Sequence, residues 1–245
     1  MQLQLSSWPE IEAYLQTSRG AIMPIGSTEQ HGPNGLIGTD ALCAEGIARG
    51  VGDRTGAVVG PTIGVGMAQH HMTFPGSMTL KPSTLVLVIR DYVLALAEHG
   101  FERFLFVNGH GGNIATIQAA FAEIYVELRA LGRPPVRCRL VNWWDNPGVQ
   151  RLSKELYGVA EGSHATASEV AVTQHLFPDH IKTAELDPPI APSGRFYDAA
   201  DYRRRFPDGR IGSNPGLATP EHGRQFYEAA VEAIARTYAE FLAEP

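Results

Sequence analysis

Apolar and polar positions follow two different patterns along the chain. Short runs rich in apolar residues, each ending at or before a Gly or Asn, predict buried strands at residues 21–25, 57–59, 103–107 and 136–142. Longer stretches with helical patterning predict helices at residues 41–51, 84–99, 114–131, 148–157, 167–176 and 220–242. This alternation predicts an α/β fold, a three-layer α/β/α sandwich with a mostly parallel central sheet.

The predicted elements form one continuous series without a linker that would divide it. A chain of 245 residues is of ordinary size for one α/β domain, so we expect residues 1–245 to form a single domain. The pattern is interrupted at residues 187–216, which are rich in Pro, Gly and Arg and show no period. Because so long a connection is unusual in a compact domain, we expect a functional loop or flap there.

Composition excludes several classes of protein. The chain is 44% hydrophobic and 19% charged, with a net charge of −6, and this mild acidity disfavours a nucleic-acid binder. No apolar stretch approaches the roughly 18 residues of a membrane span. The first residues lack a basic run before an apolar stretch, so we expect no signal peptide and a cytoplasmic location. Cys43 and Cys138 are far apart in the chain and do not indicate a disulfide framework.

Candidate chemistry begins just after the first predicted strand, with Glu29, His31 and Asp40. Side chains two residues apart on an extended backbone point to the same side, so Glu29 and His31 are expected to face one site. That site lies at the carboxyl edge of the sheet, where open α/β sheets bind ligands. Each residue also has an ordinary interpretation, Asp40 as the cap of the next helix and the other two as solvated loop residues.

Two further clusters of polar residues also lie near the ends of predicted strands or helices. Residues 108–113 read Asn-Gly-His-Gly-Gly-Asn between a strand and a helix, and their glycines allow close approach of a ligand to His110. A Gly-rich turn or a phosphate cradle is the alternative, although the segment lacks the Lys of a P-loop and the GxGxxG spacing. His164 and Glu169 flank a predicted helix start, where a Glu also interacts favourably with the helix dipole.

Carboxylates and imidazoles that converge at strand ends suit divalent ions such as Zn²⁺, Mn²⁺ or Fe²⁺. A shared carboxylate such as Asp40 can bridge two ions about 3.5–4 Å apart, and such a pair acidifies a bridging water and polarises a carbonyl oxygen. No cysteine has ligand-like spacing near these clusters, so a structural zinc site built on thiolates is not indicated.

The clusters resemble the creatininase family, which comprises creatinine amidohydrolase and its relatives. The matching residues are Glu29, His31, Asp40, residues 109–113 (Gly-His-Gly-Gly-Asn) and residues 164–169. Residues 71–77 (His-x-x-Phe-Pro-Gly-Ser) and 214–223 also look like family segments, so the similarity runs from about residue 20 to 240. The resemblance implies a dinuclear metal-dependent amidohydrolase with an α/β/α sandwich, often hexameric.

The resemblance also implies a ligand set for each ion. Glu29, Asp40 and His110 match the ligands of one ion, whereas His31 and Asp40 match ligands of the second. We therefore expect two divalent metal ions per subunit as cofactors, either Zn, Mn or Fe.

Two positions depart from the family pattern. Creatininase proper has a Glu where this chain has Gly112, as in a GHGGN-bearing branch closer to formamide hydrolases. We expect Glu169 to supply the missing ligand. Many relatives also read HAGExET where this chain has Ala167 in place of the first Glu, and both departures argue against creatinine as the substrate.

The resemblance places His164 near the substrate, where we expect it to be catalytic and to deliver a proton to the leaving nitrogen. A structural role is the alternative. We expect five residues to contact the substrate, with ordinary packing as the alternative: His71, Ser77, Gly111, Trp143 and Trp144. We expect the remaining histidines to be structural or solvated: His70, His99, His175, His180 and His222.

We therefore expect a hydrolase of a small-molecule amide, cleaving a non-peptide C–N bond of a cyclic amide or formamide with a metal-bridging water. A metal-dependent peptidase of the same family is one alternative, and a non-catalytic metal- or nucleotide-binding module is another. A serine hydrolase is disfavoured because the chain has no GxSxG motif. We expect a homo-oligomer, for which a hexamer like those of the family is one candidate. We expect neither nucleic acid nor a membrane as a partner.

Overall fold

The computed structural model describes residues 1–245 and contains one four-stranded sheet. Its strands are β1 (Gly20–Ile25), β2 (Val58–Val59), β3 (Arg103–Asn108) and β4 (Arg137–Asn142). They lie in the order β2-β1-β3-β4, and every neighbouring pair is parallel. The register sets Ile25 beside Asn108 and Asn108 beside Asn142, so three strands end together at one edge.

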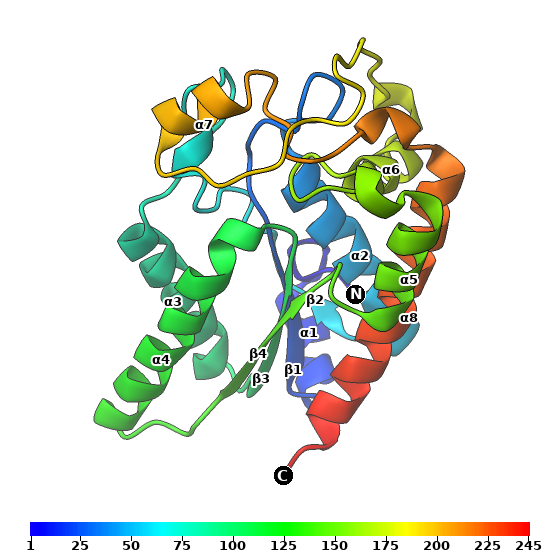
Figure 1. Ribbon diagram of the computed structural model, residues 1–245. Coiled ribbons are helices and arrows are strands. Elements are labelled where there is room, and N and C mark those ends of the chain that lie inside the picture. The colour runs from blue at the N-terminus through cyan, green and yellow to red at the C-terminus, as the bar shows by residue number, and fades with distance from the viewer.

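Helices cover both faces of the sheet, as Figure 1 shows. One face carries α3 (Pro82–Glu98) and α4 (Ile114–Ala130), and the other carries α2 (Thr39–Thr55) and α8 (Pro220–Ala243). Two shorter helices pack on α8, namely α5 (Pro147–Leu156) and α6 (Ala167–Leu176). The predicted three-layer α/β/α sandwich is confirmed. None of the helices combines the length and the apolar composition that crossing a bilayer requires.

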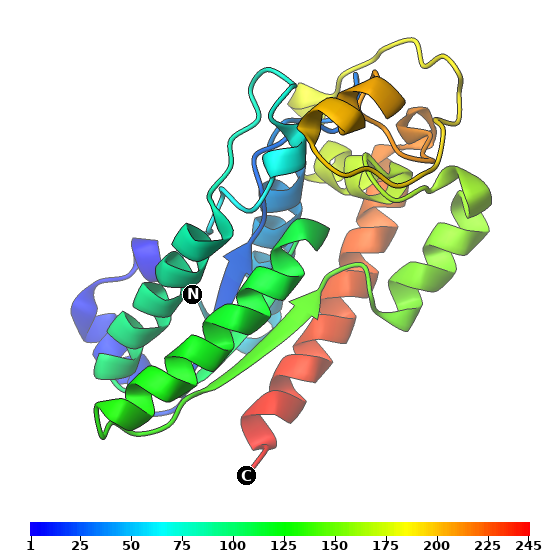
Figure 2. The ribbon, with the colours of Figure 1, turned by 60° about the vertical axis from the view of Figure 1, so that its left-hand side comes forward.

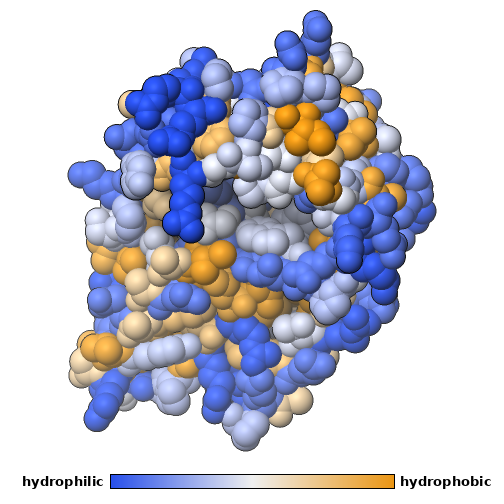
Figure 3. Space-filling view, viewed as in Figure 1, coloured by the Kyte–Doolittle hydropathy of each residue, from blue (hydrophilic) through white to orange (hydrophobic).

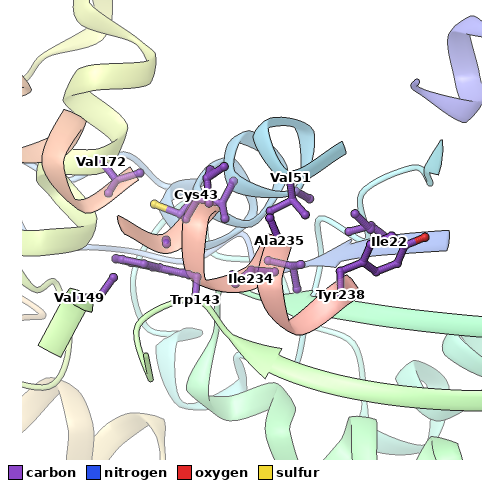
Figure 4. Packing of buried hydrophobic residues seen from close by; sticks show 14 of the residues in the cluster. Ile22, Cys43, Val51, Trp143, Val149, Val172, Ile234, Ala235 and Tyr238 are labelled. Carbon is purple, nitrogen blue, oxygen red and sulfur yellow. The ribbon is translucent and has the colours of Figure 1, made fainter. Parts of the chain in front are cut away.

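Alternate strand residues divide the apolar interior into two cores. Ile22 and Leu105 point toward α2 and α8, where they join a cluster that includes Cys43, Trp143 and Tyr238 (Figure 4). The neighbouring strand residues Ala21, Met23, Phe104 and Phe106 point the other way. They pack against α3 and α4, which contribute Leu85, Ile89, Ile117 and Ile124 to the second core. Because both faces are buried, the strands read as apolar runs rather than as alternating patterns. Both cysteines are free.

Two helices lie where the sequence pattern indicates none. The first, α1 (Trp8–Leu15), begins with a capping box formed by Ser7 and Glu10 and has a proline in its first turn. The second, α7 (Ala199–Arg205), lies within residues 187–216 and is capped by Asp198, so this part of the expected loop is helical instead. Figure 2 shows that the segment passes above the carboxyl ends of the strands.

Leu105→Ala tests the core on the α8 side of the sheet. Leu105 is fully buried, so its truncation should lower the free energy of unfolding by about 2–5 kcal/mol through lost burial and a residual cavity. Leu5→Ala, at a position that is 79% exposed, is the control and should change this free energy by less than about 0.5 kcal/mol. Urea unfolding followed by circular dichroism measures both, and equal effects would contradict the described core.

Candidate metal centre

Three segments bring side chains together at the carboxyl edge of the sheet. Glu29 follows β1, His110 follows β3, and Asp40 lies in the first turn of α2. Gly109 permits this approach, because a Cβ there would lie 2.0 Å from the backbone carbonyl oxygen of Asp40. The cap of α2 is Gly38, so the helix begins one residue before Asp40 and its carboxylate does not cap it.

Asp40 lies between two imidazoles. Its Oδ1 is 2.9 Å from Nε2 of His31, and its Oδ2 is 3.1 Å from Nδ1 of His110. The same His110 nitrogen is 3.3 Å from Oε1 of Glu29. All four side chains are buried. Since each Asp40 oxygen faces a different imidazole, the carboxylate has the geometry of a bridging ligand.

The opposite nitrogen of each imidazole meets a backbone carbonyl. Nδ1 of His31 is 3.1 Å from the carbonyl oxygen of Glu29, and Nε2 of His110 is 3.0 Å from that of Met67. A carbonyl oxygen only accepts, so these ring nitrogens carry hydrogen and donate. Metal-binding histidines make the same outer hydrogen bond, which leaves the other nitrogen for the ion.

Three carboxylate oxygens at the centre have no hydrogen-bonding partner: Glu29 Oε1, Glu29 Oε2 and Asp40 Oδ2. Buried unpaired carboxylates require a compensating positive charge. In the metal-free protein the histidines supply it. Burial lowers the pKa of His31, but Asp40 and Glu169 outweigh burial and raise it to about 10. At His110, Glu29 and Asp40 likewise outweigh burial and raise the pKa to about 9.

This donor set of carboxylate oxygens and imidazole nitrogens fits Zn²⁺, Mn²⁺ or Fe²⁺. A divalent ion would satisfy the unpaired oxygens of Glu29 and Asp40 directly. It would also replace the protons on the two histidine nitrogens that face Asp40. The geometry and chemistry of the centre are therefore those of a group that could hold a metal ion.

Glu169 approaches the same centre from the first turn of α6. Its Oε1 is 3.9 Å from Nε2 of His31, and ligand atoms of His31, Asp40 and Glu169 lie within 4.8 Å of one another. Glu169 also forms a capping box with Thr166, so it both stabilises the helix end and faces the centre. Burial raises the pKa of Glu169 to about 7, against the opposing effect of His31.

Gly112 has a steric role beside this centre. A Cβ at this position would lie 2.4 Å from Nε2 of His110 and 2.7 Å from the carbonyl oxygen of Met67. Because that nitrogen donates to that carbonyl, a side chain at position 112 would displace the imidazole. The local backbone thus has no room for a glutamate here, and the nearby carboxylate comes from Glu169 instead.

His164 turns one ring nitrogen toward the centre. Its Nδ1 is 3.8 Å from Oε1 of Glu29, and its Nε2 is 2.9 Å from the carbonyl oxygen of Gln30. Burial lowers the pKa of His164 far below its ordinary value, and the neighbouring His71 and His31 lower it further. The imidazole is therefore neutral at neutral pH, and its protonated form would readily give up the proton.

A pocket of about 820 Å³ opens onto the centre. In Figure 3 the surface is hollowed above the carboxyl ends of the strands, with apolar side chains on its rim. The pocket lining includes most of the residues singled out in the sequence: Asp40, His110, Gly111, Trp143, Trp144, His164 and Glu169. Trp143 also belongs to the apolar core, so it joins the pocket wall to the packing beneath it.

Two residues expected to contact substrate lie behind the centre rather than on the pocket wall. His71 places Nε2 at 3.1 Å from Oε1 of Glu29 and Nδ1 at 3.0 Å from Nε2 of Gln30. The Ser77 hydroxyl accepts a hydrogen bond of 3.2 Å from the Gln30 backbone amide. The structure therefore places both where they hold Glu29 and Gln30.

His70 was expected to be structural or solvated, but it lies beside the centre. Ligand atoms of Glu29, His70 and His110 lie within 4.8 Å of one another. Its only local signal is the adjacent His71, because the contact between His70, in the short helix η2 (Gln69–His71), and His110 joins residues remote in sequence. His99 and His180, by contrast, are exposed, as expected.

These features define a class of protein, an α/β protein with a buried carboxylate–imidazole centre at the carboxyl edge of a parallel sheet. A family model for creatininase, described as creatinine amidohydrolase, matches residues 4–238. The chain therefore belongs to the creatininase family.

Similar proteins agree with this membership. The mycofactocin precursor peptide peptidase of Mycobacterium tuberculosis is 28% identical, over 94% of this chain and 88% of the relative. The creatinine amidohydrolase of Pseudomonas putida is 27% identical, over 94% of this chain and 92% of the relative. A solved manganese form of creatininase has a TM-score of 0.86 at 25% identity and covers 99% of both chains. Each of these names denotes a hydrolase, and family membership supports a hydrolytic enzyme.

The metal-free protein should lose stability as the pH rises. The pKa values of His31 and His110 in the folded state, about 10 and about 9, exceed the ordinary histidine value of about 6.5. Their contribution to the free energy of unfolding is therefore complete below about pH 6.5 and is lost as the pH rises through these folded-state values. Urea unfolding with a chelator present, repeated across this interval, measures the loss.

His31→Gln should remove much of this pH dependence, because it removes one of the two histidines whose pKa is raised. His99→Gln is the matched control at an exposed position, and it should leave the dependence unchanged. A free energy of unfolding for the unaltered chain that stays constant over the interval would contradict the buried charge pairs.

Proposed function

We propose that this protein is a dinuclear metal-dependent amidohydrolase that cleaves a non-peptide C–N bond of a cyclic amide or a formamide. The observation that carries the proposal is the position of Asp40, buried between two imidazoles with Oδ2 unpaired by any hydrogen bond. A shared carboxylate of this kind is typical of paired-ion hydrolases. The creatinine amidohydrolase of P. putida and the manganese form of creatininase support the same reaction class and cofactor class.

The chain offers a ligand set for each of two ions. Each ion would be held by one imidazole and two carboxylates, with one carboxylate common to both: Glu29, Asp40 and His110 for the first, and His31, Asp40 and Glu169 for the second. Bound ions of this type supply an acidified water and polarise the amide carbonyl. The backbone carbonyls behind the two histidines keep the ligating nitrogens turned toward the ions.

His164 is the group placed to move a proton. It lines the pocket, and its lowered pKa would make its protonated form a strong acid, so it is placed to carry a proton to the leaving nitrogen. Its Nε2 contacts the Gln30 carbonyl, which fixes the direction of its ring. His71 and Ser77 hold Gln30 in turn, so their contribution to the reaction is to orient His164 and Glu29.

The pocket indicates the size of the substrate. Its volume of about 820 Å³ lies within the range of about 300–1,000 Å³ typical of small-molecule sites, and it far exceeds a formyl group. Trp144 and Gly111 offer apolar surface, whereas Lys154 and Glu161 add charge to the lining. We therefore propose that the scissile amide is attached to a larger, partly planar molecule with polar substituents.

A peptidase is the second candidate function. The observation that favours it is the similarity to the mycofactocin precursor peptide peptidase, whose match covers 94% of this chain. The pocket volume would also admit a short peptide end. Turnover of a cyclic amide, an N-formylated aromatic amine and a short peptide by the metal-loaded protein separates the two functions. Cleavage of the peptide alone would replace the proposed amidohydrolase with a peptidase.

Asp40→Asn should abolish both ion sites, because it removes the charge that the two ligand sets share. We expect amide hydrolysis to fall more than about 100-fold, since even outer supports of a metal site are worth about 10- to 100-fold. Asp53→Asn, in the exposed part of α2, is the matched control and should retain both ions and full turnover. Metal analysis and a product assay measure the two effects. Full ion content and activity in Asp40→Asn would refute the proposed mechanism.

Glu169→Gln should remove only the second ion. The amide keeps the size of the side chain and can still accept the helix-capping hydrogen bond, but it is a much weaker metal ligand. We expect about one ion per chain after dialysis in place of about two. Glu155→Gln, exposed on α5, controls for loss of a surface carboxylate. If the Glu169 variant keeps both ions, this residue is not a ligand.

A further inference from the structure

His70 lies at the centre, and neither the ligand sets nor the proton transfer above gives it a role. It lies on η2 next to His71, and its ring centroid is 6.1 Å from that of His110 with an interplanar angle of 15°. On the other side it stacks on Phe196, at 5.1 Å and 24°. Phe196 belongs to the 187–216 segment, which passes above the strand ends (Figure 2). His70 therefore lies between the metal centre and this covering segment.

The distances allow His70 to reach an ion at the first position. Ligand atoms of Glu29, His70 and His110 lie within 4.8 Å of one another. Metal–ligand bonds are about 2.0–2.2 Å long, so two ligands on opposite sides of one ion are separated by at most about 4.4 Å. Atoms that already lie within 4.8 Å of one another can reach such a separation by small side-chain rotations. The three residues are thus close to the separation that a shared ion requires.

The environment of Glu29 also favours a further ligand. Glu29 is fully buried; its Oε1 faces ring nitrogens of His71 and His110 at 3.1 and 3.3 Å, whereas its Oε2 has no partner. His71 and His110 are each tied by a hydrogen bond at the nitrogen that faces away from Glu29, to Gln30 and to the Met67 carbonyl. His70 is instead held by ring contacts, which leave its ring nitrogens available to an ion.

We propose that His70 is a fourth protein ligand of the ion held by Glu29, Asp40 and His110, and that Phe196 keeps its ring turned toward that ion. The inference rests on the proposed function, because it needs a bound ion. It gives the first position two imidazoles and two carboxylates, a set that suits Zn²⁺, Mn²⁺ or Fe²⁺. It also makes the 187–216 segment part of the metal site's support rather than a cover alone.

Two substitutions of His70, by side chains of nearly the same size, test the proposal. His70→Gln removes the imidazole and leaves a very weak ligand, whereas His70→Glu offers a carboxylate at nearly the same position. His99→Gln is the control at an exposed position. Chelator competition gives the affinity for each ion, and the visible absorption of the Co²⁺-loaded protein reports its coordination. We expect His70→Gln to weaken one of two ions by about 10-fold or more, and His70→Glu to retain it with a changed spectrum.

The outcomes separate the two proposals. If the unaltered chain binds two ions and His70→Gln matches its affinity and Co²⁺ spectrum, the His70 ligand is overturned and the two-ion centre stands. If the unaltered chain binds no ion, both are overturned. Equal losses in the Gln and Glu variants, together with a lower melting temperature of both metal-free proteins, would assign His70 a structural role and overturn the proposal.

Discussion

The structure depends on one constraint, the burial of two carboxylates that few hydrogen bonds within the protein satisfy. Glu29 and Asp40 are shielded from solvent, yet three of their four oxygens accept no hydrogen bond. A buried carboxylate is stable only beside positive charge. The aligned ends of β1 and β3, and the glycine at 109, bring His31 and His110 to these oxygens and meet that requirement.

Two kinds of positive charge can satisfy the same carboxylates. In the metal-free protein the charge is a proton on each imidazole, which the raised pKa values of His31 and His110 express. In the proposed enzyme it is a pair of divalent ions, which would displace those protons. In the metal-free protein the backbone carbonyls of Glu29 and Met67 already hold the rings with the other nitrogen turned toward the carboxylates. The centre is thus organised by the fold before an ion binds.

Much of this arrangement could be predicted from local sequence, because buried parallel strands read as apolar runs and their ends carry the functional residues. The clusters around Glu29 and His110 were accordingly expected at this edge, whereas His164 was placed near the substrate by the family resemblance. The structure brings all three together. The helix α1 had a usable signal in its Ser7–Glu10 capping box. The position of His70 had none, because it depends on contacts with Phe196 and His110, which are remote in sequence.

The central claim is that two ions share Asp40. Anomalous scattering from crystals of the protein loaded with Zn²⁺ or Mn²⁺ tests it most directly, because the method locates each ion and its ligands. The account predicts two peaks on opposite sides of the Asp40 carboxylate, one beside Glu29 and His110 and the other beside His31 and Glu169. A loaded crystal with no peak at Asp40, or with a single ion there, would contradict it.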